Sequence, residues 1–141
     1  MKVVFAGTPE FSAFHLKLLL NSEHKICQVI TQPDRKSGRG NRIKGSEVKA
    51  LAVENNISLL QPSSFRANKD AISILEEESP DIILVVAYGL MLPKEVLRIP
   101  RLGCINVHAS LLPRWRGAAP IERCILSGDK KSGITFMKME E

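Results

Sequence analysis

The chain has 141 residues, of which 44% are hydrophobic and 25% charged, a composition that excludes intrinsic disorder and fits one globular domain. The 20 Lys and Arg residues exceed the 15 Asp and Glu residues, and the net charge of +5 permits an anionic partner without establishing one. The three cysteines form no C-x-x-C pair, and no apolar run approaches the roughly 20 residues of a membrane span. We therefore expect a cytoplasmic monomer with no disulfide framework, no metal site and no membrane segment.

The first expected element is a buried strand over residues 3–6, where β-branched and aromatic residues stand together before Gly7. Thr8 is expected to cap a helix whose first position is Pro9, since the first helical nitrogen needs no partner. Helical spacing predicts that the apolar face of this helix consists of Phe11, Phe14 and Leu18. A second buried strand over residues 26–30 then forms a parallel pair with the first through a right-handed crossover.

The alternation of strands and helices continues to the end of the chain. The remaining expected strands are residues 57–60, 82–87, 104–107 and 134–137. The remaining expected helices are residues 46–55, 67–78 and 120–126, with a short one inside 90–99. This pattern predicts the fold class α/β: a Rossmann-like, doubly wound and mostly parallel sheet with helices on both faces.

A basic stretch with interspersed glycines runs from residue 35 to residue 44 and contains no acidic residue. Its five cations are Arg35, Lys36, Arg39, Arg42 and Lys44. We expect a mobile loop, because such a composition does not pack as a core element. The loop is either a solvated surface or a segment that follows the phosphates of an RNA.

The first strand-to-helix turn lacks a dinucleotide-binding motif. Gly7 stands alone where G-x-G-x-x-G is expected, and Pro9 has no N–H to offer a pyrophosphate. Residues 31–33 also hold no acid that could bind a ribose. The sequence contains neither a Walker A loop nor G-x-S-x-G, so it gives no support to phosphoryl transfer or serine hydrolysis.

Asn106 and His108 stand two residues apart near the carboxyl end of an expected strand, so their side chains share one face. An amide and an imidazole side by side can polarise a carbonyl oxygen and move a proton, which is what acyl transfer needs. Alternatively, Asn106 caps a loop and His108 is a hydrogen-bonded residue inside the domain. The spacing alone does not decide between the two.

The string S-L-L-P-R-W-R-G-A-A-P at residues 110–120, with the N-x-H before it, resembles the folate-dependent formyltransferases and, among them, the methionyl-tRNA formyltransferases. Further similar strings are F-A-G-T-P-E-F at 5–11, T-Q-P-D-R at 31–35 and V-V-A-Y-G-L-M-L-P at 85–93. The resemblance implies transfer of a formyl group from 10-formyltetrahydrofolate to the amino group of initiator methionyl-tRNA, for translation initiation.

The resemblance also implies roles for single residues. Asn106 would donate to the developing oxyanion, and His108 would transfer a proton from the attacking amine. The walls of the folate pocket would be Tyr88, Gly89, Leu90, Met91 and Leu92 together with Ser110, Leu111, Leu112 and Pro113. For Leu90, Met91 and Leu92, packing in the core is the alternative.

The basic stretch matches a loop that enters the tRNA acceptor stem in this family, with Arg39 as its central arginine and Arg35, Lys36, Arg42 and Lys44 beside it. Arg114 and Arg116 would add contacts near the end of the tRNA. Trp115, which lies between these two, is either part of that contact or a packing anchor.

The family's third catalytic residue, an aspartate after the strand near residue 134, has no counterpart before the chain ends at Glu141. We therefore expect residues 1–141 to be the N-terminal part of a formyltransferase catalytic domain, without the family's C-terminal β-barrel. The resemblance does not imply that this part is active by itself. The alternatives are a sugar-nucleotide formyltransferase, which has no need of the basic stretch, and a non-catalytic module that binds folate or RNA.

Overall fold

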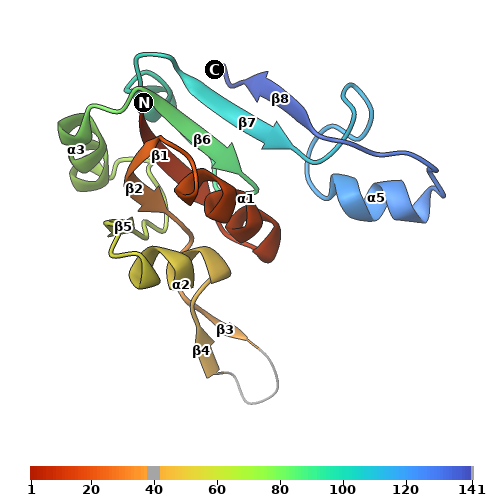
Figure 1. The fold of residues 1–141 in the computed structure, drawn as a ribbon, viewed down its shortest axis with the longest axis horizontal. Coiled ribbons are helices and arrows are strands. Elements are labelled where there is room, and N and C mark those ends of the chain that lie inside the picture. Colours follow the sequence, from red (N-terminus) through yellow and green to blue (C-terminus); the bar gives the residue numbers. More distant parts are fainter. Residues whose placement is uncertain (38–41, 141) are drawn as a thin grey trace.

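The computed structural model describes residues 1–37 and 42–140, and it contains a six-stranded sheet with helices on both faces (Figure 1). The sheet has the order β5-β2-β1-β6-β7-β8. Its strands are β1 (Lys2–Gly7), β2 (Lys25–Ile30), β5 (Leu59–Leu60), β6 (Ile82–Val86), β7 (Cys104–His108) and β8 (Thr135–Lys138). All neighbouring strands are parallel except β7 and β8, which are antiparallel. The predicted doubly wound, mostly parallel fold is confirmed.

Two apolar cores lie on the two faces of this sheet. On one face, Phe5 and Val29 pack with α1 (Glu10–Leu20) and α2 (Glu47–Glu54). On the other, Val4 and Ile30 pack with Phe65 and with α3 (Lys69–Glu78) and α4 (Lys94–Leu97). Because neighbouring strand residues point to opposite faces, covering both faces requires the continuous apolar runs seen in β1 and β6.

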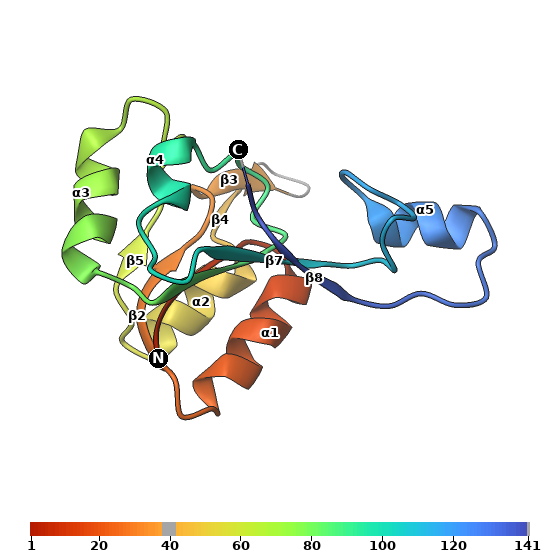
Figure 2. The same cartoon turned by 90° about the horizontal axis from the view of Figure 1, so that it is seen from above.

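The fifth helix, α5 (Pro120–Leu126), stands apart from these layers, beyond the carboxyl end of β7 (Figure 2). Cys124 is its buried residue, while Ile125 and Leu126 are 72% and 86% exposed. The chain returns from α5 to the sheet as the edge strand β8. No helix in residues 1–37 and 42–140 is long and apolar enough to cross a membrane.

The predicted cap and apolar face of the first helix are wrong in part. The helix begins at Glu10 with Pro9 at the N-cap position, and Thr8 Oγ1 donates instead to the Tyr88 carbonyl oxygen at 2.9 Å. Phe14 and Leu18 are 60% and 56% exposed. The buried residues are Ser12, Ala13 and Leu16. The small side chains of Ser12 and Ala13 let the helix lie close against the sheet.

The basic stretch is not a simple loop in its described parts. β3 (Arg35–Ser37) and β4 (Arg42–Lys44) pair antiparallel, with Arg35 opposite Lys44. Backbone hydrogen bonds between two strands need no apolar core, so the composition of this stretch did not predict them. Residues 38–41, which include Arg39, lie outside the described residues.

Candidate active site

Asn106 and His108 lie two residues apart on β7, so both side chains share one face of the strand. The strand is interior at this point: Asn106 is the register partner of Val85 on β6 and of Met137 on β8, and His108 is that of Thr135. Both side chains are half-buried. Strands on both sides fix the backbone of β7 at Asn106, and β8 fixes it at His108, so the amide and the imidazole are presented from a rigid element.

His108 has both ring nitrogens in contact with the segment that follows β7. Nδ1 lies 2.9 Å from Ser110 Oγ, and Nε2 lies 3.2 Å from the Gly117 carbonyl oxygen. Ser110 Oγ donates its one hydrogen to the Arg114 carbonyl oxygen at 2.7 Å, so toward His108 the hydroxyl can only accept. The Gly117 carbonyl oxygen can also only accept, so each ring nitrogen faces an acceptor and the two contacts fix no single neutral tautomer. In the neutral form that keeps its proton on Nδ1, Nε2 is the atom that can take a proton from a substrate.

The turn after β7 is tied to β8 by one hydroxyl. Thr135 Oγ1 donates to the Ser110 carbonyl oxygen at 2.7 Å and accepts from the Leu112 backbone N–H at 3.1 Å. Ser110 is 1% exposed, whereas Leu111 is 53% exposed. The Leu112–Pro113 peptide bond is cis, and Pro113 is exposed. Two of the four predicted folate residues here therefore hold the turn, and the other two lie at the surface.

The segment of residues 88–92, after β6, divides between core and surface. Tyr88 and Leu92 are 1% and 5% exposed within the core beneath α3 and α4, and Leu90 packs against that core. Burial raises the pKa of the Tyr88 hydroxyl to about 12. Met91 is 88% exposed, and Gly89 is exposed with a φ of +82°. Core packing describes Tyr88, Leu90 and Leu92, while Gly89 and Met91 are open to a ligand.

A cavity of about 210 Å³ lies at the carboxyl ends of β1 and β2. Its lining comes from the residues after these strands, the β3–β4 pair and the start of α2: Thr8, Pro9, Gln32, Pro33, Arg35, Lys44, Gly45, Ser46 and Glu47. A larger one of about 460 Å³ lies at the opposite edge of the sheet, beside α3 and α4. Neither is lined by residues 88–92 or 110–113, so the predicted folate cleft between those segments stays a prediction.

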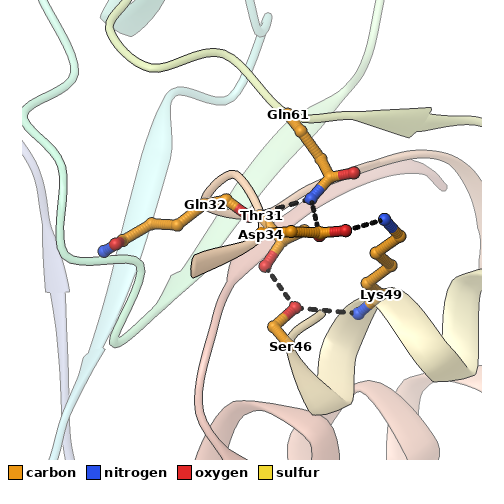
Figure 3. Close-up of polar contacts among 6 residues, drawn as sticks. All are labelled: Thr31, Gln32, Asp34, Ser46, Lys49 and Gln61. Atoms are coloured by element: carbon orange, nitrogen blue, oxygen red, sulfur yellow. Dashed lines mark hydrogen bonds and ion pairs between the residues drawn. The ribbon is translucent and has the colours of Figure 1, made fainter. Parts of the chain in front are cut away.

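Polar contacts beneath the smaller cavity hold the segment after β2 in place (Figure 3). Asp34 accepts from Lys49 Nζ at 2.6 Å and from Gln61 Nε2 at 2.8 Å, and these two donors hold its pKa below the usual range. Thr31 Oγ1 and Ser46 Oγ lie 2.7 Å apart. Sequence reasoning missed this network, because its members come from three separate segments. Among the described residues, no group of three His, Cys, Asp or Glu side chains could hold a metal ion.

The two arginines that flank Trp115 have different environments. Arg114 donates to Asp129 through Nε at 2.8 Å and Nη2 at 2.7 Å, and its guanidinium lies 4.3 Å from the centre of the Trp115 ring. Trp115 Nε1 donates to the same carboxylate at 2.7 Å. Arg114 and Trp115 lower the pKa of Asp129 to about 2. These contacts agree with the interpretation of Trp115 as a packing anchor, and Arg116 is exposed.

A family model described as formyl transferase matches residues 1–141. The chain is 61% identical over 140 residues to a methionyl-tRNA formyltransferase of Pseudomonas fluorescens (strain Pf0-1), covering 99% of this chain and 44% of that protein. It is 55% identical over 141 residues to a methionyl-tRNA formyltransferase of Pseudoalteromonas translucida (strain TAC 125), covering 100% of this chain and 44% of that protein. The chain thus spans less than half the length of these relatives.

Solved structures share the fold at low sequence identity. A phosphoribosylglycinamide formyltransferase from Bacillus halodurans superposes with a TM-score of 0.78 at 18% identity, over 100% of this chain and 73% of that one. A formyltetrahydrofolate deformylase from Pseudomonas syringae pv. tomato superposes with a TM-score of 0.71 at 21% identity, over 99% of this chain and 46% of that one. These likenesses bear on the fold alone.

Proposed function

The chain belongs to the formyl transferase family, and we propose that the protein it comes from transfers a formyl group from 10-formyltetrahydrofolate to the amino group of initiator methionyl-tRNA. The observation that carries this function is the 55% to 61% identity, over the whole chain, to methionyl-tRNA formyltransferases. Residues 1–141 would be the N-terminal part of the catalytic domain, in a monomeric cytoplasmic enzyme. The relatives are more than twice as long as this chain, which supports its assignment to the N-terminal part.

The chemistry assigns one task to each side chain of the pair on β7. The amine nitrogen attacks the formyl carbon, and the Asn106 amide donates to the oxygen on which negative charge develops. His108 takes the proton that the amine loses, through Nε2. The bond from the formyl carbon to the folate nitrogen then breaks, and that nitrogen takes up a proton as the new amide is left on the methionyl group.

The Ser110 hydroxyl supports this assignment of His108, because it can accept from Nδ1–H and so favours the ring form with a lone pair on Nε2. The Gly117 carbonyl oxygen, 3.2 Å from Nε2, favours the form with a proton on Nε2. The substrate amine would replace that carbonyl as the partner of Nε2.

The folate would lie between the two segments that end beside β7. Met91 and Leu111 are 88% and 53% exposed and could cover a pterin-like ring, with Gly89 and Pro113 leaving room beside them. Tyr88, Leu90, Leu92, Ser110 and Leu112 would act as the support of these walls.

The tRNA would approach from the side of the β3–β4 pair. Arg35 and Lys44 line the cavity at the ends of β1 and β2, and Lys36, Arg39 and Arg42 belong to the same basic stretch. Arg116 would contribute a further exposed cation. Arg114 is engaged by Asp129, so we expect it to contribute less to RNA contact than Arg116.

Single-residue variants of the complete enzyme test the catalytic assignment. Asn106→Ala should lower kcat by about 10²–10³-fold, as loss of one oxyanion donor does elsewhere, and His108→Ala should lower kcat far more than it changes tRNA affinity. Asn21→Ala, at the exposed end of α1, is the matched control and should change neither. Near-normal turnover by either active-site variant at saturating substrates would overturn its role.

Binding to initiator tRNA separates this function from sugar-nucleotide formylation and from a non-catalytic module. Affinity should fall steeply with salt, and each phosphate contact removed should lower the log–log slope by roughly 0.7 to 0.9. Arg39→Ala should raise the tRNA KM more than Lys36→Ala does, with folate binding unchanged. Indifference to tRNA together with formylation of a sugar nucleotide would replace the proposed substrate, and binding without turnover would favour the module.

A further inference from the structure

Asp129 lies at the turn after α5 and gathers three hydrogen bonds from one short segment. Arg114 Nε and Trp115 Nε1 both donate to Oδ2, at 2.8 and 2.7 Å, and Arg114 Nη2 donates to Oδ1 at 2.7 Å. The Asp129 side chain is 16% exposed, although that of Arg114 is 58% exposed. One carboxylate therefore holds two consecutive residues of the segment that follows β7.

The backbone of this segment needs such an anchor. Trp115 has a φ of +58°, a left-handed conformation that a bulky side chain rarely adopts unless its surroundings impose it. The fixed indole N–H and the stacked guanidinium are what impose it here.

Two carbonyl groups of this segment connect it to His108, that of Arg114 through Ser110 and that of Gly117 directly. The Arg114 carbonyl takes the hydrogen of Ser110 Oγ and so makes that hydroxyl an acceptor for Nδ1–H. The Gly117 carbonyl lies 3.2 Å from Nε2. The segment therefore presents one acceptor to each ring nitrogen, directly to Nε2 and through Ser110 Oγ to Nδ1, and a shift of the segment would change both contacts.

We propose that Asp129 is a positioning residue for His108, because its carboxylate holds Arg114 and Trp115 and thereby places the Arg114 and Gly117 carbonyls that contact Ser110 and the imidazole. Its kinetic consequence rests on the proposed function, whereas its effect on the imidazole does not. Asp129 itself contacts neither His108 nor the atoms assigned to the reaction.

The test replaces Asp129 by Asn in the complete protein. The carboxamide keeps the shape but offers one acceptor oxygen and turns an NH₂ group toward the Arg114 and Trp115 donors. Asp81→Asn is the matched control, since Asp81 also takes two hydrogen bonds from one arginine, Arg101, at the opposite edge of the sheet. Asp129→Glu keeps the charge and should restore part of the effect.

Nitrogen NMR of the His108 ring is the readout that a merely structural role would not move. We expect the two His108 ring nitrogens to give the same signals in the parent and in Asp81→Asn, to shift in Asp129→Asn because both acceptor contacts change, and to return in part in Asp129→Glu. Trp115 is the single tryptophan of residues 1–141. Its indole N–H signal in the complete protein is the one that disappears in Trp115→Phe, and that signal should shift with loss of the carboxylate. In the same variant kcat should fall about 10- to 100-fold with the folate KM within about twofold.

Unchanged His108 ring signals in Asp129→Asn while the Trp115 signal shifts would overturn the proposal, as would an equal loss of kcat in Asp81→Asn. If Asp129→Asn does not fold, Trp115→Phe removes the indole N–H together with one ring of the side chain, and the His108 ring signals carry the same test. A parent protein without formyl transfer would refute the proposed function, and the ring signals would still decide the role of Asp129.

Discussion

Gly7, the last residue of β1, is where the sheet and α1 come closest, and a methyl group there would have no space. A Cβ at this position would lie 2.6 Å from Ser12 Cβ, 2.9 Å from Phe5 Cε1 and 2.9 Å from the Val86 carbonyl oxygen. Ordinary contact begins at 3.4 Å, so α1 would have to move by 0.8 Å, the difference between 3.4 and 2.6 Å. That movement would also stretch the hydrogen bond from Ser12 Oγ to the Val86 carbonyl oxygen.

The magnitude follows from these three contacts. Overpacking a core by one methyl group costs about 1–3 kcal/mol, and weakening the buried Ser12 hydrogen bond adds about 1 kcal/mol. The reduced freedom of the unfolded chain offsets about 0.4–1 kcal/mol. We therefore expect Gly7→Ala to lower the free energy of unfolding by about 1–3.6 kcal/mol.

Urea unfolding measures this effect, with Gly45→Ala as the matched control. A Cβ at Gly45 would meet the Lys49 side chain, at 2.9 Å from Cδ, and this flexible chain can move aside. The control should stay within about 1 kcal/mol of the parent, because flexible surface contacts adjust at little cost. A Gly7→Ala protein as stable as Gly45→Ala would refute the close-approach reasoning.

Two further predictions concern buried and charged groups. Tyr88→Phe should leave the free energy of unfolding unchanged or raise it by about 1 kcal/mol, since the buried hydroxyl has no hydrogen-bond partner among the described residues; a clear loss of stability in urea unfolding would contradict this. The lowering of the Asp129 pKa from 3.8 to about 2 means that its carboxylate stabilises the fold fully above about pH 4 and ceases to do so as pH falls through 2. The difference in free energy of unfolding between parent and Asp129→Asn should therefore be constant above about pH 5 and shrink between about pH 4 and 2. A difference that persists at about pH 2 would count against the Arg114 and Trp115 contacts as its cause.

The strands could be predicted from sequence because burial on both faces leaves a continuous apolar run. Val4 and Phe5 point into opposite cores, and the same holds for neighbouring residues of β6. The N-x-H spacing likewise predicts that Asn106 and His108 share a face, since this follows from the period of a strand alone.

The contacts between segments could not be predicted in this way. The exposed positions of Phe14 and Leu18 depend on how closely α1 approaches the sheet, which Ser12 and Ala13 permit and hydrophobic periodicity does not record. The Asp129 contacts join residues 14 and 15 positions apart across a helix. The sequence does narrow the choice of an acidic partner for Arg114, because Glu122 and Asp129 are the only acidic residues between residues 110 and 138.

Three of the sequence strings that carried the resemblance meet at one backbone atom. Thr8, from the string at residues 5–11, donates to the Tyr88 carbonyl oxygen at 2.9 Å, and Gln32, from the string at 31–35, donates to it at 2.8 Å. Tyr88 belongs to the third string, at 85–93. A Cβ on Gly89 would meet Gln32 Nε2 and disturb its hydrogen bond to the Tyr88 carbonyl, and the φ of +82° favours glycine beside this junction. The strings are far apart in sequence yet form one support at the carboxyl ends of β1, β2 and β6, and this support holds the edge of the sheet on which the Asn106 and His108 pair depends.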